Sequence, residues 1–390
     1  MHQNLLDELK DDDFDAVDEQ AETSAVEDEY EKPVAIRMGR IGIGQAGCNM
    51  AMIDYLLGSR SVFLINTAES DLESIKHPIP KLPISKQGTA KDRELGRKFA
   101  QQRAMEIRNK MDRVFESNVE KVVIYLSLGG GTGSGAGPEV IRIAKEYILE
   151  RGGNPKSDII VVQVLPTPSI DGDKPCFNAL KAYGEIDRLG VATVTIDNSK
   201  LLKVRKPKLG NFWGRMNYWV VHTLHQFNVY ARIPTEIGQF DAREFNDILN
   251  QGRFMYTMFK VKSLGDQYTI GEEMCNHLKR SVFVDTELGS AKKAACILAL
   301  NRNTVTDRHL SSITTAFEDL NRLMAPGSTL HQGMYLEDFE TNAPADEPSD
   351  LYGYVMLGGL GHPMDTLERI FERAKDFSQE YGSVNAFLTS

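Results

Sequence analysis

The chain of 390 residues lacks several features that would fix its class at once. Its four cysteines are scattered without a CxxC pair, so neither a zinc site nor a disulfide framework is indicated. No apolar run approaches the roughly 18 residues of a membrane-spanning helix, and the first residues lack the basic and apolar regions of an export signal. The GxxxxGK[ST] phosphate loop is also absent. We therefore expect a cytoplasmic protein without a membrane segment.

Acidic charge is concentrated at one end of the sequence. Residues 1–32 contain 13 Asp or Glu and two Lys, a net charge of -11, whereas the whole chain carries -10. A segment so charged and so poor in aromatic residues is expected to be a disordered tail. It either serves only as a solvated tail or acts as an arm for a basic partner.

One glycine-rich stretch organises the rest. Residues 121–126 are apolar and rich in β-branched side chains, which is typical of a buried strand. They are followed by SLGGGTGSGAGP at 127–138 and by a helical pattern at 139–149. We interpret the glycines as a strand-to-helix turn. Its backbone N–H groups, at the positive end of a helix, favour phosphate.

A second glycine motif lies near the start of the folded region. Residues 34–43 read as a strand, and 42–47 (GIGQAG) have the GxGxxG spacing. In dinucleotide-binding enzymes an acid follows about 20 residues later and binds the ribose. Here the second strand, 61–65, runs into Asn66 and Thr67. An NAD-dependent oxidoreductase is thus a remote alternative, and two glycine turns fit one polyphosphate held between them.

These two motifs, with further loops in the same order, resemble the tubulin/FtsZ superfamily of GTPases over roughly residues 34–300. The resemblance implies GTP/GDP as the bound nucleotide and Mg²⁺ as its metal ion. Since Ala68 stands where FtsZ commonly has an aspartate, water-mediated Mg²⁺ contact is expected from Glu69 or Asp71. The residues expected around the phosphates are Gly44, Gln45, Ala46, Cys48 and Asn49 in the first loop, Thr67 and Ala68 in the second, Gly88, Thr89 and Ala90 in the third, and Gly129, Gly130, Gly131, Thr132, Gly133 and Ser134 in the fourth.

The resemblance also assigns the sugar and the base. Asp171 follows the strand at 158–164 and is expected at the ribose, although Pro175 replaces an arginine of FtsZ. Asn198 resembles the asparagine that reads guanine, and its amide offers both a donor and an acceptor. Trp213 and Asn217 are four residues apart on a long helix predicted for 211–233, which puts them on one face. They resemble tubulin residues that stack on the base and read it.

Two acidic residues after this helix carry the expected chemistry. Asp241 and Glu244 resemble the loop that enters the nucleotide site of the next subunit in the family, although Gln239 replaces the usual asparagine. Three-residue spacing at a helix start puts both carboxylates on one face, where they can orient a water toward the γ-phosphate. The alternative is that both are ordinary capping and helix-dipole residues.

The expected fold class is α/β, with a parallel, Rossmann-like GTPase domain, a long central helix and a smaller α+β C-terminal domain. The expected divisions are an acidic tail at 1–32, the GTP-binding domain at 33–210, the central helix at 211–233, the catalytic loop with the α+β domain at 234–362, and a helix and tail at 363–390.

The implied function is that of a GTP-hydrolysing cytoskeletal protein that polymerises head-to-tail with itself, of a plasmid, phage or archaeal branch, acting in segregation, positioning or division. The alternative is a GTP-binding regulatory or structural relative that polymerises poorly and acts through a partner. An adaptor or cargo protein is expected to use the acidic tail or the C-terminal helix, and no direct contact with nucleic acid is expected.

Overall fold

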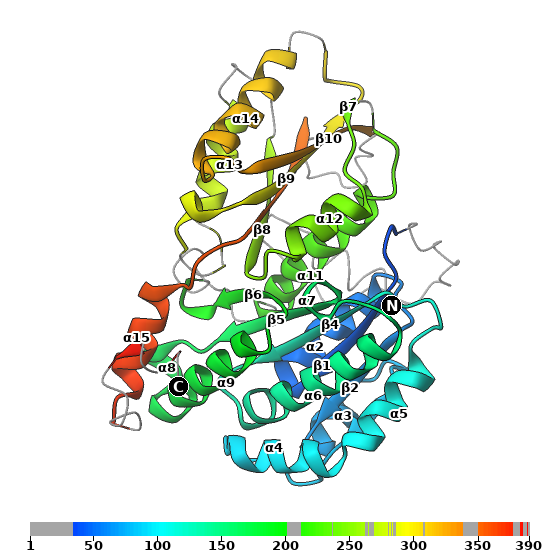
Figure 1. Ribbon diagram of the computed structural model, residues 1–390, viewed down its shortest axis with the longest axis vertical. Helices are drawn as coiled ribbons and strands as arrows, with labels where there is room; N and C mark the ends of the chain where they lie inside the picture. Colours follow the sequence, from blue (N-terminus) through cyan, green and yellow to red (C-terminus); the bar gives the residue numbers. More distant parts are fainter. Residues whose placement is uncertain are drawn as a thin grey trace, which may run out of the picture.

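A computed structural model describes residues 34–200, 212–235, 237–261, 269–279, 286–306, 309–337 and 350–376, together with 264, 281, 283, 383, 384 and 388. The tail predicted for 1–32 lies outside these residues. Two sheets are joined by a long helix (Figure 1).

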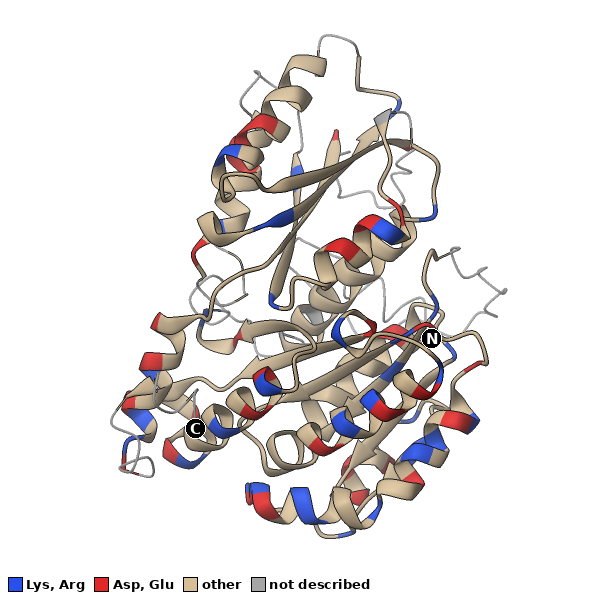
Figure 2. Ribbon diagram, viewed as in Figure 1, with Lys and Arg blue, Asp and Glu red and all other residues tan. Residues whose placement is uncertain are grey.

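The first sheet has six parallel strands in the order β3-β2-β1-β4-β5-β6. Most of its strands are apolar and buried on both faces, because helices cover both. The charged residues lie mainly on those helices, whereas the strands carry few (Figure 2). The strands are β1 Met38–Ile43, β2 Val62–Asn66, β3 Lys81–Pro83, β4 Lys121–Ser127, β5 Ile159–Leu165 and β6 Ala192–Asp197.

The helices of this domain form two layers. Buried side chains of α2 share a core with the central helix on one face of the sheet. Those of α4, α5, α6 and α9 form a second core on the other face. The helices are α2 Gly44–Leu56, α3 Glu69–Ser74, α4 Arg93–Gln102, α5 Ala104–Val114, α6 Gly131–Glu150, α7 Pro155–Asp158, α8 Pro168–Asp171 and α9 Asp173–Arg188.

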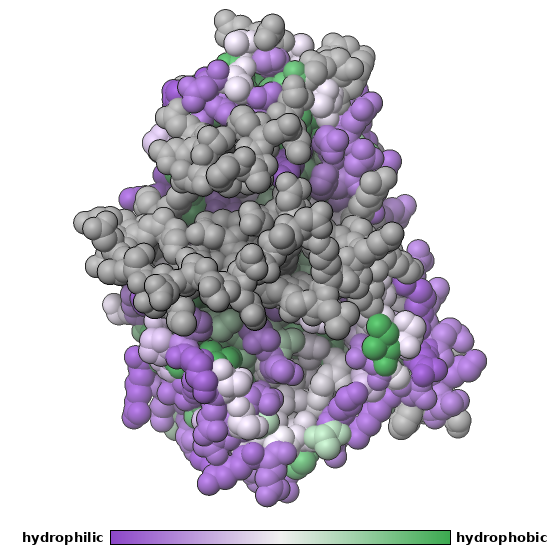
Figure 3. Space-filling view, turned by 180° about the vertical axis from the view of Figure 1, so that it is seen from behind, coloured by the Kyte–Doolittle hydropathy of each residue, from purple (hydrophilic) through white to green (hydrophobic). Residues whose placement is uncertain are grey.

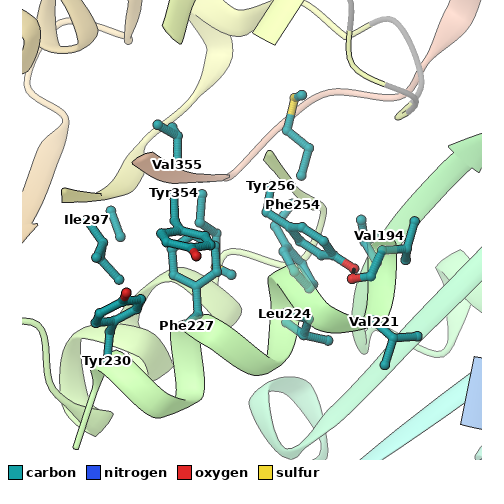
Figure 4. Close-up of a cluster of buried hydrophobic side chains, with 14 of the residues drawn as sticks. Val194, Val221, Leu224, Phe227, Tyr230, Phe254, Tyr256, Ile297, Tyr354 and Val355 are labelled. Carbon is teal, nitrogen blue, oxygen red and sulfur yellow. Dashed lines mark hydrogen bonds between the residues drawn. The ribbon is translucent and has the colours of Figure 1, made fainter. Parts of the chain in front are cut away.

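The long central helix is confirmed as α11, Phe212–Tyr230. Its apolar side chains, among them Val221, Leu224 and Phe227, are buried. They meet Val194 of the first sheet and, from the second sheet, Phe254, Tyr256, Ile297, Tyr354 and Val355 (Figure 4). The helix is therefore packed against both sheets and holds them in one core.

The second sheet is mixed, in the order β7-β10-β9-β11-β8. Only β9 and β10 pair in parallel, and the other pairs are antiparallel. The smaller α+β unit is thus present, and the predicted fold class is confirmed. Its strands are β7 Ile237–Gly238, β8 Phe254–Val261, β9 Lys293–Asn301, β10 Thr329–Glu337 and β11 Leu351–Gly358, and its helices α12 Ala242–Leu249, α13 Thr269–Lys279 and α14 Leu310–Leu323.

The chain then returns to the first domain through α15, Met364–Ala374. Leu367 and Ile370 are buried in the same core as α9, and Figure 1 shows α15 beside α8 and α9. Among the described helices none joins the length to the apolar composition needed to cross a bilayer. The coloured surface in Figure 3 is mostly hydrophilic, with a few separate apolar side chains.

The glycine run differs from the predicted turn. Helix α6 begins at Gly131, so only residues 128–130 form the connection and the later glycines are helical. A Cβ on Gly133 would overlap the carbonyl oxygen of Ser127, and one on Gly135 would overlap that of Arg93. These glycines allow the backbone of α6 to contact the backbones of β4 and α4 directly. Local sequence does not reveal this requirement.

Candidate functional site

Two glycine turns face each other at the carboxyl edge of the first sheet. The strand order reverses between β1 and β4, and ligands of open α/β sheets bind outside the carboxyl ends of strands at such a point. Gly44 is the first residue of α2 and directly follows β1, whereas a short turn containing Gly129 and Gly130 follows β4. A Cβ built on Gly44 lies 3.5 Å from Cβ of Thr132. The two turns expected to share one ligand are therefore neighbours.

The second and third predicted loops join this pair. The hydroxyl oxygens of Thr67 and Thr132 are 2.6 Å apart, and the Gly88 N–H donates to the Thr67 carbonyl over 2.9 Å. Ala68 bridges to Gln87 in the third loop. All four phosphate loops of the prediction thus converge.

The third loop is held in a strained backbone conformation. Ala90 has φ 47° and Lys91 φ 63°, the two non-glycine residues with positive φ in the described part of the chain. Such backbone costs of order 1–3 kcal/mol per residue and persists where the surroundings impose it. The amide nitrogen of Asn178 donates to the Lys91 carbonyl over 2.9 Å and to the Gly129 carbonyl over 3.3 Å. Asn178 therefore ties the third loop to the fourth, and nothing in its helical sequence context indicated this.

Gly130 stands apart from its neighbouring glycines. Its φ of -78° and ψ of 166° suit any residue, and a Cβ there would meet nothing within 4 Å. A Cβ on Gly131, in contrast, would overlap the Thr89 hydroxyl. Contacts within the described part of the chain therefore do not require glycine at position 130. The open space in front of it fits the close approach of a ligand to the backbone.

The predicted sugar and base residues lie on elements at the same edge. Asp171 follows β5, and its carboxylate accepts the Thr167 N–H over 2.7 Å, so one oxygen is engaged within its own turn. Asn198 directly follows β6 and is partly exposed. Trp213 is 50% exposed at the start of α11, and Asn217 lies one turn further and is half-buried.

The first loop presents most of its predicted side chains, with one exception. Gln45 is exposed, whereas Ala46 and Asn49 are partly exposed. Cys48 is buried, with its sulfur 3.5 Å from the Gly42 carbonyl oxygen and 3.6 Å from that of Ile65. Burial raises the pKa of this thiol to about 12. The thiol faces the sheet because it lies on the inner face of α2, and the place of Cys48 beside the nucleotide stays a prediction.

The two candidate magnesium carboxylates lie in the first turn of α3. Asp71 accepts the Asn66 side-chain amide over 3.1 Å, and Glu69 lies two residues earlier in the same turn. The described residues contain no group of three or more metal-ligating side chains. Mg²⁺ commonly keeps several waters and uses one or two carboxylates with substrate phosphates, so this pair fits an outer contact to a phosphate-bound ion.

The structure does not bring the two acids to these loops. Gly252, which follows α12, accepts the N–H of Thr193 at the start of β6, and Asn154 before β5 contacts Asn250. Figure 1 accordingly shows α12 beside α7, whereas α8 lies at the opposite end of β5. Asp241 and Glu244 therefore lie toward the amino edge of the sheet, with the loops at its carboxyl edge.

Each acid has a defined local role. Asp241 is the N-cap of α12, and its carboxylate accepts the N–H groups of Arg243 and Glu244 over 2.8 and 3.0 Å. One oxygen of Glu244 lies 3.1 Å from Nδ1 of His331, and the other is buried without a hydrogen-bond partner among the described residues. Asp241 is thus a helix-capping residue, as the alternative prediction stated. Capping does not neutralise its carboxylate, so the charge can still act on a water molecule.

Residues 37–206 match the model of the Tubulin/FtsZ family, GTPase domain. Residues 37–206 therefore belong to the tubulin/FtsZ family. The chain is 25% identical to cell division protein FtsZ 1 of Pyrococcus horikoshii over 218 residues, which cover 53% of this chain and 54% of that protein. It is 30% identical to the tubulin-like protein CetZ4 of Haloferax volcanii over 129 residues, 30% of this chain and 33% of that one. The matched stretch thus spans about half the length of the FtsZ relative.

Solved structures of the superfamily share the whole fold. A GTPγS-form protofilament of Bacillus thuringiensis TubZ superposes with a TM-score of 0.73 at 19% identity, covering 89% of this chain and 94% of that one. CetZ2 from Haloferax volcanii, in a GTPγS-bound protofilament, gives 0.69 at 19% identity, covering 88% and 99%. The superfamily fold therefore extends through the second sheet, beyond the matched GTPase domain.

Proposed function

We propose that this tubulin/FtsZ superfamily member binds GTP between the glycine turns of β1 and β4 and hydrolyses it in a head-to-tail filament of its own copies. The observation that carries the proposal is the separation of the site into two halves. Four phosphate loops converge at the carboxyl edge around the open face of Gly130, whereas the two acids lie toward the amino edge.

In this proposal each part of the nucleotide has its own residues. The turns at Gly44 and Gly129–Ser134 bind phosphate oxygens through backbone N–H groups, and the strained third loop, Gly88–Ala90, lies at the γ-phosphate. Asp171 meets the ribose, while Asn198, Trp213 and Asn217 meet the base. Glu69 and Asp71 hold the waters of a Mg²⁺ ion, which when bound neutralises charge on the phosphates.

Hydrolysis requires a second molecule. Because Asp241 and Glu244 are remote from the loops of their own chain, they act on the nucleotide of a neighbour. They orient a water whose oxygen attacks the γ-phosphorus as the bond to the β–γ bridging oxygen breaks, and a carboxylate accepts the water's proton. A contact between unlike faces does not close, so it builds a filament, as the protofilaments of TubZ and CetZ2 illustrate for those proteins.

The decisive experiment separates capping from catalysis. Asp241→Asn keeps a good N-cap and removes the charge, so we expect unchanged melting temperature, retained GTP binding, and hydrolysis reduced at least ~100-fold. Gly130→Val should instead block nucleotide binding, because its side chain projects into the open space. Mixing the two inactive variants should restore hydrolysis, since Gly130→Val subunits bring intact acids to the GTP of Asp241→Asn subunits. Absence of any recovery, with filaments present, would contradict action between subunits.

A further inference from the structure

Helix α15 lies far along the chain from the nucleotide loops and yet contacts the turn that carries Asn198. It follows the second sheet, but Leu367, Ile370 and Ala374 are buried in the core of the first domain. The linker before it is anchored as well, because His362 Nδ1 lies 3.1 Å from the Tyr183 hydroxyl of α9. Two arginines of α15, one turn apart, each pair with an aspartate of the first domain: Arg369 with Asp197 and Arg373 with Asp173.

The first arginine neutralises a fully buried carboxylate. Nη2 of Arg369 lies 3.0 Å from Oδ2 of Asp197, whose side chain is 0% exposed. The Thr366 hydroxyl donates to the same oxygen over 3.2 Å. The other oxygen accepts the N–H of Ser199 over 2.8 Å and the Ser199 hydroxyl. Asp197 thus binds α15 on one side and the residue after Asn198 on the other.

The second arginine makes a much weaker contact. Nε of Arg373 lies 2.9 Å from Oδ1 of Asp173, at the start of α9 and two residues from Asp171, but the two side chains are 51% and 39% exposed. Exposed pairs typically contribute less than about 1 kcal/mol, whereas removing one partner of a buried pair leaves a desolvated charge. The Arg369 side chain is itself 40% exposed, but its removal would leave the buried Asp197 carboxylate without its cation.

We infer that α15 braces the base-reading turn, with Arg369 acting as a positioning residue for Asn198 through Asp197. This inference rests on the proposed guanine site. Asn198 is flanked by two residues of one hydrogen-bonded set, so its backbone orientation follows from theirs. Whatever moves α15 changes the affinity for guanine nucleotide, which places control of the pocket in a helix 166 residues beyond Asn198.

A double-mutant cycle on the full chain tests the coupling, with GDP affinity measured by equilibrium titration. Arg369→Met and Asn198→Ala should each weaken GDP binding, Arg369→Met by about tenfold. The double variant should bind no more weakly than Asn198→Ala alone, because the arginine acts through that amide. Arg373→Met is the matched control on the same helix, and we expect its affinity to stay within twofold of the parent.

The outcomes separate the inference from the proposed function. If Arg369→Met weakens GDP binding by the same factor in the parent chain and in the Asn198→Ala variant, its effect does not pass through Asn198 and the inference is wrong. If the parent chain does not bind GDP at all, the proposed function fails first. Melting temperatures identify unfolding, and Asp197→Asn/Arg369→Met, which removes both charges, supplies a folded alternative. GDP affinity in that pair as low as that of a folded Arg369→Met supports the brace, because the contact is missing in both. Restored affinity contradicts it, because the loss in Arg369→Met would then come from the unpaired buried charge.

Discussion

The imidazole of His331 on β10 lies between Glu244 and Asp247 of α12, with Nδ1 3.1 Å from the first carboxylate and Nε2 3.1 Å from the second. Lys293 of β9 lies 3.0 Å from Asp247 and completes the set. Burial would raise the pKa of Asp247, but hydrogen bonds from Lys293 and His331 outweigh it and lower the pKa. The proposed catalytic acid is thus fixed to the second sheet by an imidazole.

His331→Phe keeps the ring volume and removes both nitrogen contacts. Glu244 would then lose its orientation, and we expect GTP hydrolysis in filaments to fall roughly 10- to 100-fold while nucleotide binding is unchanged. The measurement is phosphate release beside GDP affinity. His277→Phe is the control, since His277 makes a looser 3.6 Å pair with Glu273 on α13; equal losses in both variants would show that the effect is not local.

Gly130 and Gly135 should respond differently to alanine. Gly135→Ala forces a methyl group into the Arg93 carbonyl and should destabilise the fold by about 1–3 kcal/mol in urea unfolding. Gly130→Ala meets no atom of the described residues within 4 Å and should leave stability unchanged while weakening GDP binding. If Gly130→Ala binds GDP normally, the open space in front of it is not the phosphate site.

Trp213 offers an optical signal for the base. It is 50% exposed, and the chain has only one other tryptophan, Trp219, which is half-buried and packs near Phe283. Stacking on guanine should change the emission of Trp213, so GDP titration should give a saturable signal that Trp213→Phe abolishes. The same signal retained in Trp213→Phe would assign it to Trp219 and remove the stacking proposal.

Acid should weaken the contact between α4 and α9. Glu185 lies 2.9 Å from Arg93 and 2.6 Å from Arg97, and although burial would raise its pKa, the hydrogen bond from Arg97 and both positive charges lower it. Because the pKa of Glu185 is lower in the folded state, its ionised carboxylate contributes fully to stability at pH values above the pKa in the unfolded state, roughly 4.3. This contribution is lost as the pH falls through the pKa in the folded state. Glu185→Gln should therefore cost about 3 kcal/mol at pH 7 and progressively less below pH ~4.

The control for this pH dependence is Glu318→Gln. Glu318 pairs with Arg322 over 3.2 Å, but both side chains are more than half exposed, so the substitution should change stability little at any pH. Urea unfolding of the three proteins between neutral and acidic pH gives the comparison. A Glu185→Gln deficit that stays constant down to the lowest pH would show that the lost term is packing and not charge.

Sequence patterns were sufficient for the parallel sheet, the long helix and the convergence of the glycine loops, because strand hydrophobicity and loop order are local properties. They did not predict that α6 begins within the glycine run. Glycine is required there because the carbonyl groups of Ser127 and Arg93 leave no room for a side chain, and only the fold brings these groups near. Asn178, His331 and Arg369 were missed for the same reason: each acts across more than 80 residues of chain.

The return of α15 also sets an order of events during synthesis. The apolar side chains of α9 that pack against Leu367 and Ile370 leave the ribosome about 180 residues before their cover does. At 5–20 residues per second that interval lasts roughly 10–35 s. During this interval, the apolar side chains of α9 in the nascent first domain are uncovered, and Asp197 lacks the guanidinium of Arg369. If the proposed function holds, a chain still being translated is poorly suited to bind nucleotide, and it would not enter a polymer until translation has passed the second sheet.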